Sequence, residues 1–204
     1  TMEPSLPEFS SVIANVLLEV VQQTRDYHLQ HGAPNPAPSS GFGPVGRLSP
    51  FDGSHVPSIT LDKYFQRLAR YAATNSSCFF AALVYLDRVI VSHSDSFALS
   101  ELNVHRLFLA SLVIATKFWS DKFYDNDYYA KIGGITGHEL SLLEVNLLLW
   151  LDFKLLIESE TFGEEYLKMS SGCTKPLVLP TLLGRFRECP WGGRGPDRAL
   201  SPHA

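Results

Sequence analysis

The sequence has few cysteines, and their spacing suits neither a disulfide framework nor a zinc site. Cys78, Cys173 and Cys189 are odd in number, and no two of them form a CxxC pair. Isolated thiols are typical of a reducing compartment, so we expect the chain in the cytoplasm, the nucleus or both. We expect no metal ion and no cofactor.

Long hydrophobic runs and a basic surplus are also missing. The apolar runs at 78–86 and 107–115 are far shorter than the ~20 residues that a membrane-spanning helix needs. No basic region followed by an apolar one marks a signal peptide near the N-terminus. With 17 basic and 21 acidic residues, the net charge of −4 weighs against a nucleic-acid partner. We therefore expect neither a membrane nor a nucleic acid as partner.

Catalytic motifs are absent, and two partial matches fail on inspection. The stretch GFGPVG fits GxGxxG, but no strand precedes it and Pro44 removes an N–H that a phosphate cradle would use. The stretch DNDYY at 125–129 begins like a calcium loop, yet Ala130 and Thr136 replace the glycine and glutamate that an EF-hand requires. We expect a protein that is not an enzyme, and an all-α enzyme with an unfamiliar site remains the alternative.

Apolar residues recur with helical spacing along most of the chain, and no alternation of period two persists. The pattern predicts an all-α fold with an N-terminal helix, a five-helix bundle and a short C-terminal helix. The expected helices cover 8–30, 60–72, 77–91, 99–119, 125–134, 136–153 and 160–172. Thr60, Asn103 and Thr136 are expected to cap helices, Thr136 in a capping box with Glu139.

The same pattern divides the chain into four parts. Residues 1–30 hold the N-terminal helix, and 31–58 are a linker rich in proline and glycine. The bundle and its trailing helix cover 59–172. Residues 173–204 have the composition of a disordered tail.

Two charged residues stand on otherwise apolar helix faces. Lys117 shares a face with Val113 and Ile114, and Glu144 shares one with Leu140 and Leu148. An unpaired buried charge costs several kcal/mol, so a pair between Lys117 and Glu144 across neighbouring helices would resolve both anomalies. In the alternative, Lys117 reaches solvent at a helix C-terminus, where the dipole favours it, and Glu144 is exposed.

Three stretches together resemble the cyclin box. They are YLDR at 85–88, LVIATKF at 112–118 and LLEVNLLLWLDFKL at 142–155. The longer stretch ATKFWSDKFYDNDYYAKIGGI is similar to the phosphate-signalling cyclins, the P- or U-type group. The resemblance covers about 57–160 and implies a cyclin box of five helices, preceded by the family's extra helix.

The resemblance implies a regulatory subunit that binds and activates a cyclin-dependent protein kinase. In cyclins the residues matching Lys117 and Glu144 bond to backbone groups at the end of the kinase's regulatory helix. The matching apolar residues around that helix are Phe118, Leu148, Phe153 and Leu155. The family's processes include the cell cycle and phosphate signalling.

Some family features are missing from this sequence. Many cell-cycle cyclins have an arginine that pairs with the residue matching Asp87, but Ser58 stands at its aligned place here, and we expect Arg88 to be exposed. The first box helix lacks the tryptophan that helps to dock substrate peptides. Too few residues follow 172 for a second fold of five helices, so we expect a single box.

Other readings stay open at this point. A cyclin-fold adaptor in transcription or scaffolding, without kinase activation, is the main alternative. Modules related to transcription factor IIB usually bind DNA through basic faces and two repeats, which the charge of −4 does not favour. Ser49 and Ser201 each precede a proline and are possible phosphorylation sites for such kinases.

Overall fold

A computed structural model describes residues 5–31, 49–93 and 97–158, and the regular structure in these ranges is helical. The helices are α1 (Leu6–His31), α2 (Leu61–Tyr71), α3 (Ser76–Ser92), α4 (Val104–Trp119), α5 (Asn126–Gly133) and α6 (Gly137–Trp150). No strand occurs in the described ranges, and the prediction of an all-α fold is confirmed. The helix expected over 160–172 and the tail at 173–204 lie outside the described residues.

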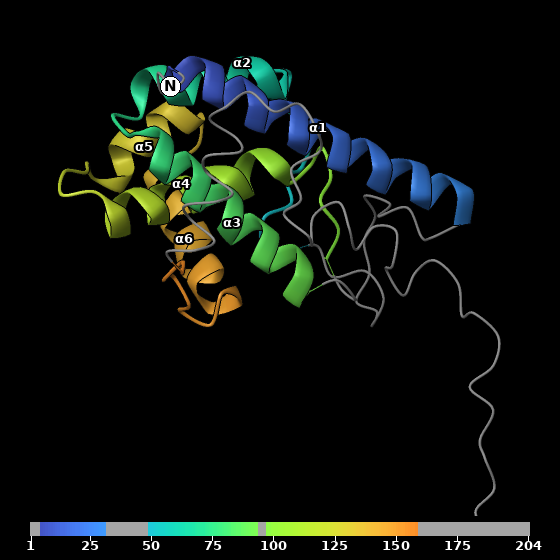
Figure 1. Ribbon diagram of the computed structural model, residues 1–204. Helices are drawn as coiled ribbons and strands as arrows, with labels where there is room; N and C mark the ends of the chain where they lie inside the picture. The colour runs from blue at the N-terminus through green and yellow to red at the C-terminus, as the bar shows by residue number, and fades with distance from the viewer. Residues whose placement is uncertain (1–4, 32–48, 94–96, 159–204) are drawn as a thin grey trace, which may run out of the picture.

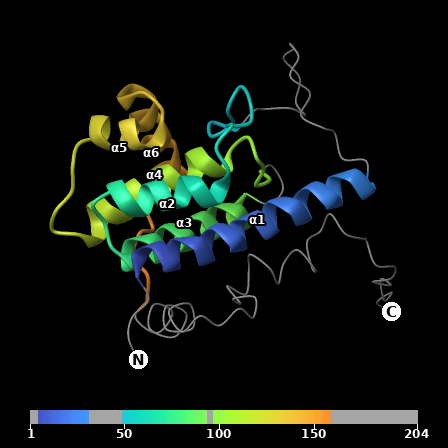
Figure 2. The same cartoon turned by 90° about the horizontal axis from the view of Figure 1, so that it is seen from above.

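The centre of the molecule is formed by α3 and α4, which pack against each other (Figures 1 and 2). Most positions of both helices carry an apolar residue that is buried. A helix that is apolar all round has no face for water and must be surrounded by other elements. The ring of Phe108 on α4 lies 4.2 Å from that of Phe65 on α2 and 5.8 Å from that of Phe79 on α3, measured between centroids.

The long helix α1 packs along α2 and also contacts α3 (Figure 2). Its apolar stripe includes Phe9, Ile13, Leu17 and Val20, none of which has any exposed area. Burying each such side chain stabilises the fold by roughly 1.5–3 kcal/mol. The stripe that the sequence shows over 8–30 is therefore covered by the chain's own helices.

Three helix starts are capped by side chains. Asn75, Asp125 and Thr136 each accept a hydrogen bond from the backbone N–H three residues later, at 2.9, 2.9 and 3.1 Å. Such a bond satisfies one of the free N–H groups of a first helical turn. At the other end of α5, Gly134 has φ of 74°, a left-handed conformation that glycine adopts without steric cost.

The expected caps at Thr60 and Asn103 are wrong in their bonding. Both residues stand at the N-cap of α2 and α4, but neither side chain bonds to its helix. The amide of Asn103 instead donates to Asp52 Oδ1 at 2.9 Å and to Ala98 O at 3.0 Å. It thereby fastens the segment that precedes α2 to the start of α4.

That segment, residues 49–58, has no helix but contributes to the core. Phe51 has no exposed area, and its ring lies against those of Phe97 and Trp150, with centroid distances of 6.5 and 5.1 Å. The sequence pattern assigns Phe51 and the rest of this segment to the linker 31–58. The last part of that range is packed like a structural element.

Candidate functional site

Lys117 and Glu144 form an ion pair between α4 and α6. The Nζ of Lys117 lies 2.6 Å from Glu144 Oε1 and 2.9 Å from Oε2, so it donates to both carboxylate oxygens. The side chains are 30% and 15% exposed. The pairing that the sequence suggested is present, and the alternative of two separate exposed charges is wrong.

Asn126, the first residue of α5, completes this pair. Its side-chain Oδ1 accepts from Lys117 Nζ at 2.8 Å, and its Nδ2 donates to Glu144 Oε2 at 2.9 Å and to Ser141 Oγ at 3.0 Å. One amide thus bridges both ions, and three helices meet at one polar cluster. We call Lys117, Asn126 and Glu144 the ion cluster.

The sequence pattern does not identify Asn126 as a member of this cluster. Asparagine at a helix start is common, because its amide suits the free N–H groups there. Nothing in the residue type or its spacing distinguishes a bridging amide from a capping one. Here the capping role belongs to Asp125, which accepts from Tyr128 N and leaves the amide of Asn126 for the ions.

A second ion pair joins the same two helices near their opening turns. Arg106 on α4 donates from Nε to Glu139 Oε1 on α6 at 2.8 Å. This pair corrects the expected capping box, because the side chain of Glu139 accepts from Arg106 and only the Thr136 half of the box forms. The pair gives a matched reference for the ion cluster, since it spans the same helices at a similar bond length.

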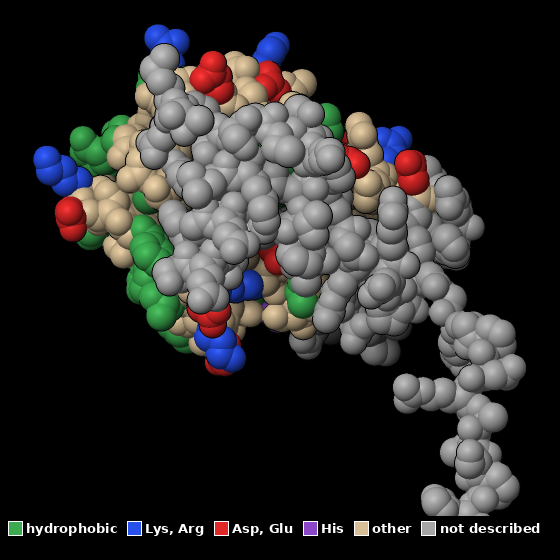
Figure 3. All heavy atoms as spheres, in the orientation of Figure 1, with side chains coloured by type: hydrophobic (Ala, Val, Ile, Leu, Met, Phe, Trp, Pro, Cys, Tyr) green, Lys and Arg blue, Asp and Glu red, His purple; other side chains and the backbone are tan. Residues whose placement is uncertain are grey.

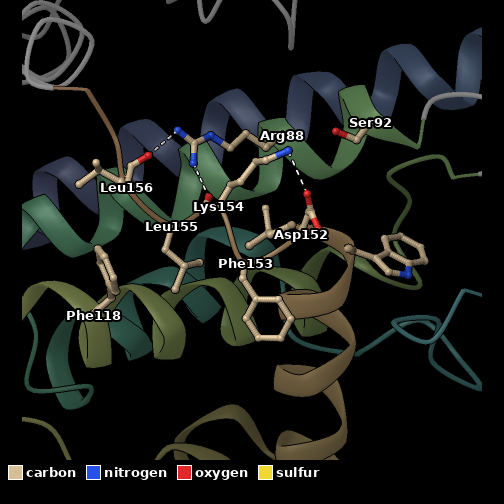
Figure 4. A pocket seen from close by; sticks show the side chains of 10 residues that line it. Arg88, Ser92, Phe118, Asp152, Phe153, Lys154, Leu155 and Leu156 are labelled. Atoms are coloured by element: carbon tan, nitrogen blue, oxygen red, sulfur yellow. Dashed lines mark hydrogen bonds and ion pairs between the residues drawn. The ribbon is translucent and has the colours of Figure 1, made fainter.

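An open groove of about 730 Å³ lies beside the end of α6 (Figure 4). Three of the predicted binding residues line it, namely Phe118, Phe153 and Leu155. Leu155 lies between the two aromatic rings in this view, and the rings come from different parts of the chain. Phe118 is 48% exposed and Phe153 is 65% exposed, so both present apolar area to solvent.

Leu148, the remaining predicted binding residue, lies on α6 one turn after Glu144. It is half-buried against the core and does not line the groove. Its carbonyl accepts a hydrogen bond from Phe153 N at 3.0 Å. Leu148 therefore connects the ion cluster to the groove along the chain.

The segment after α6, residues 151–157, is held by side chains of α3. Tyr85 Oη donates to Leu155 O at 2.8 Å, and Arg88 donates to Lys154 O at 2.6 Å and to Leu156 O at 2.9 Å. The expectation that Arg88 is simply exposed is wrong: it is half-buried, and its guanidinium bonds to this segment (Figure 4). The YLDR stretch thus has a structural role that its residue types alone did not reveal.

Tyr85 also accepts a hydrogen bond from Trp119 Nε1 at 2.8 Å. Burial raises the pKa of Tyr85 to about 12, although the bond from Trp119 acts in the opposite direction. The hydroxyl therefore keeps its proton at neutral pH and remains a donor to Leu155 O. One hydroxyl consequently ties the last residue of α4 to the segment after α6.

Exposed hydrophobic side chains gather on the side of the molecule where α4 ends and α6 lies (Figure 3). Those of the α4 end and the turn to α5 are Phe118, Trp119, Phe123 and Tyr124. On α6 they are Leu142, Val145 and Leu149, which follow helical spacing on the outer face. A cluster of this kind on a folded chain is typical of a protein-binding surface.

Two further predictions concern modification and metal binding. Ser49 is half-buried in a turn, where its Oγ accepts from Phe51 N at 3.1 Å, and Ser201 lies outside the described residues. Phosphorylation of either serine stays a prediction. Within the described ranges, no group of three or more potential metal ligands lies together, and no helix is long and apolar enough to cross a membrane.

Comparison with known proteins places this geometry in context. The cyclin family model matches residues 8–155, from α1 to the groove. Cyclin-U4-1 of Arabidopsis thaliana is 40% identical over 135 residues, which are 65% of this chain and 66% of that protein. Cyclin-P3-1 of Oryza sativa subsp. japonica is 38% identical over 119 residues, 58% of this chain and 50% of that protein.

A fungal relative shows a similar level of identity. PHO85 cyclin-7 of Saccharomyces cerevisiae is 39% identical over 120 residues, 54% of this chain and 42% of that protein. The matches to these three relatives cover between 42% and 66% of their lengths. The range matched by the cyclin family model contains α4, α5 and α6, which carry the ion cluster.

Proposed function

Since this chain belongs to the cyclin family, in the group of plant U- and P-type cyclins and PHO85 cyclins, we propose that it binds and activates a cyclin-dependent protein kinase. Cyclins are non-catalytic regulatory subunits, in agreement with the prediction that the chain is not an enzyme. The alternative of an adaptor without kinase activation becomes an outcome of the test below.

The observation that carries the proposal is an ion cluster next to an exposed apolar groove. An amphipathic helix of a partner lays its apolar face into such a groove. Phe118 directly follows Lys117, and Leu148 follows Glu144 by one turn, so charged and apolar contacts adjoin on both α4 and α6. The ions can then bond to backbone groups at the end of the incoming helix.

The hydrogen bonds in the cluster indicate how the ions meet a partner. A lysine ammonium has three N–H donors, and three oxygens already surround that of Lys117. A carbonyl of the kinase must therefore replace one of them, and the neutral amide oxygen of Asn126 costs less to displace than a carboxylate oxygen. Glu144 keeps unused lone pairs and accepts an N–H without losing Lys117.

Activation follows from differential affinity. A protein kinase aligns ATP only when a lysine of its β3 strand pairs with a glutamate on its αC helix. A partner that binds the aligned arrangement more tightly shifts the population toward it. A shift from mostly inactive to mostly active requires about 5 kcal/mol of differential affinity, which a protein interface of standard size supplies.

Binding and activation should be measured with a panel of cyclin-dependent kinase catalytic subunits that includes PHO85. We expect Lys117→Ala and Glu144→Ala each to weaken binding roughly 10- to 100-fold, as for loss of a hydrogen bond to a charged group, and to lower kinase activity in parallel. Glu139→Ala is the matched control: it breaks the other ion pair between α4 and α6 and should leave affinity unchanged.

Three outcomes separate the readings. If Lys117→Ala and Glu144→Ala both bind and activate the kinase as well as the wild type does, the proposed contact between the ion cluster and the kinase helix is refuted. Binding without activation by the wild-type chain would favour the adaptor alternative. Equal weakening by Glu139→Ala would show that general loosening of α4 and α6, rather than contact with the kinase, explains the effect.

A further inference from the structure

Two consecutive residues after α6 have a backbone conformation that L-amino acids rarely adopt. Asp152 has φ of 51° and Phe153 has φ of 54°, both in the left-handed region. This conformation costs roughly 1–2 kcal/mol for each residue other than glycine, and for a bulky residue such as Phe153 it is an outlier. Other contacts must therefore hold the turn in place.

The turn is strained, yet it holds an aromatic ring in solvent. Phe153 is 65% exposed, so the fold gains little apolar burial from this placement. Strain that persists without a gain in packing is typical of a site whose function needs that geometry. Phe153 lines the groove of Figure 4, where it faces the region of Phe118 across Leu155.

Backbone bonds to the end of α6 close the turn, among them Phe153 N to Leu148 O at 3.0 Å, and side chains of α3 hold the residues that follow it. Tyr85 and Arg88 together donate to three successive carbonyls of the chain, those of Lys154, Leu155 and Leu156. Hydrogen bonds to a backbone fix its path whatever side chains follow. The path of residues 154–156 in turn fixes where the strained turn begins and ends.

The same set of contacts reaches the other wall of the groove. Trp119 Nε1 donates to the hydroxyl of Tyr85, and the ring of Trp119 meets that of Phe118 edge to face at a centroid distance of 5.2 Å. Tyr85 itself has no exposed area and cannot touch a partner. It links the residue next to Phe118 with the segment that carries Phe153.

We propose that Tyr85, Arg88 and Trp119 are positioning residues of the kinase groove, which set the separation of Phe118 and Phe153 through their bonds to one another and to the segment after α6. The inference rests on the proposed function and adds the part of the molecule that shapes its binding surface. A partner helix then meets a gap of fixed width between two rings, because α3 holds both walls. Loss of the α3 bonds frees residues 154–156, and the ring of Phe153 is then no longer held at a fixed distance from Phe118.

A double-mutant cycle tests this role. Arg88→Met keeps the length of the side chain and removes both bonds to the segment, and Phe153→Ala removes the ring that the bonds position. We expect each single variant to weaken kinase binding about 10-fold. The double variant should bind no more weakly than Phe153→Ala alone, since Arg88 acts through that ring.

Arg67→Met is the matched control for loss of an arginine bond. Arg67 Nη2 donates to Lys131 O at 3.0 Å, away from the groove residues, and its substitution should leave affinity unchanged. Circular dichroism and thermal unfolding would establish that every variant folds. Should Arg88→Met fail to fold, Arg88→Lys replaces it, because lysine keeps the charge but not the forked geometry.

The outcomes distinguish this inference from the proposed function. Additive losses in the cycle, or unchanged affinity of Arg88→Met, would overturn the positioning role. The proposed function would stand in that case, provided that Lys117→Ala still weakens binding. If the wild-type chain binds no kinase of the panel, the proposed function and this inference fall together.

Discussion

The ion cluster and the segment 151–157 form two ends of the proposed binding site and are built in opposite ways. In the ion cluster, side chains of α4, α5 and α6 bond to one another. In the segment, side chains of α3 bond to backbone carbonyls. The first end takes its geometry from the packing of helices, while the second is a strained turn followed by a stretch of backbone that α3 holds.

This difference teaches how specificity and stability are distributed. Removing one ion of the pair changes the charge that a binding partner contacts. It also leaves the other ion half-buried without its opposite charge. Removing the bond from Tyr85 on α3 changes no charged contact and frees only part of the segment after α6. The ion cluster should therefore respond strongly in stability and binding, and the segment mainly in the shape of the groove.

The largest effect should come from breaking the ion pair. Lys117→Ala and Glu144→Ala should each lower the free energy of unfolding by about 2–3 kcal/mol, less than for a fully buried pair because Lys117 is 30% exposed. The double variant should lose less than the sum, since no charge is left without its partner. Urea unfolding measures all three, and strict additivity would show that the ions do not stabilise each other.

Tyr85→Phe should have the next largest effect. It removes the donor to Leu155 O and the acceptor for Trp119 Nε1, which should lower the free energy of unfolding by about 1–2 kcal/mol. Tyr128→Phe is the control, because it removes a hydroxyl that bonds to Tyr71 O at 2.6 Å outside the groove. Only Tyr85→Phe should also weaken kinase binding.

The same substitution has a pH signature. Because the pKa of Tyr85 is raised from 10.0 to about 12, the folded chain binds more protons than the unfolded chain between these values. The stabilisation from the hydroxyl is present below pH 10 and is lost as the pH rises toward 12. The gap in stability between wild type and Tyr85→Phe should narrow over this window, and a constant gap would contradict the assignment.

The smallest effect should come from relieving the strained turn. Asp152→Gly should raise the free energy of unfolding by about 0.5–1 kcal/mol, because glycine adopts a positive φ without the steric cost. Ala73 has φ of 47° between α2 and α3, so Ala73→Gly is a matched control of strain elsewhere. Both variants should gain stability in thermal unfolding, and kinase affinity should respond only to Asp152→Gly.

The helices and the ion pair could be predicted because both affect the periodic spacing of apolar residues in the sequence. Helical spacing of apolar residues marked the stripe of α1 and the cores of α3 and α4. A charge that interrupts such a stripe is visible in the same pattern, so the sequence identifies Lys117 and Glu144. The resemblance to cyclins then added Phe118, Leu148, Phe153 and Leu155 as residues around one groove.

The other contacts of the site do not affect the periodic spacing of apolar residues, so the sequence does not predict them. A backbone carbonyl has the same chemistry at every residue, so the sequence does not show that Arg88 bonds to those of Lys154 and Leu156. The bridging amide of Asn126 and the pairing of Glu139 with Arg106 depend on how close the helices pack. Phe51 stands in a proline- and glycine-rich range, where a single buried ring gives no period to detect.

The way that α1 lies against α2 and α3 bears on how this protein should be divided for expression. A fragment that contains only the five helices of the cyclin box would start near residue 57. Such a fragment would lack α1, which covers apolar side chains on α2 and α3. These apolar side chains of α2 and α3 would then be exposed to solvent, and the fragment would tend to aggregate. The shortest fragment that stays monomeric in solution should therefore begin before Phe9.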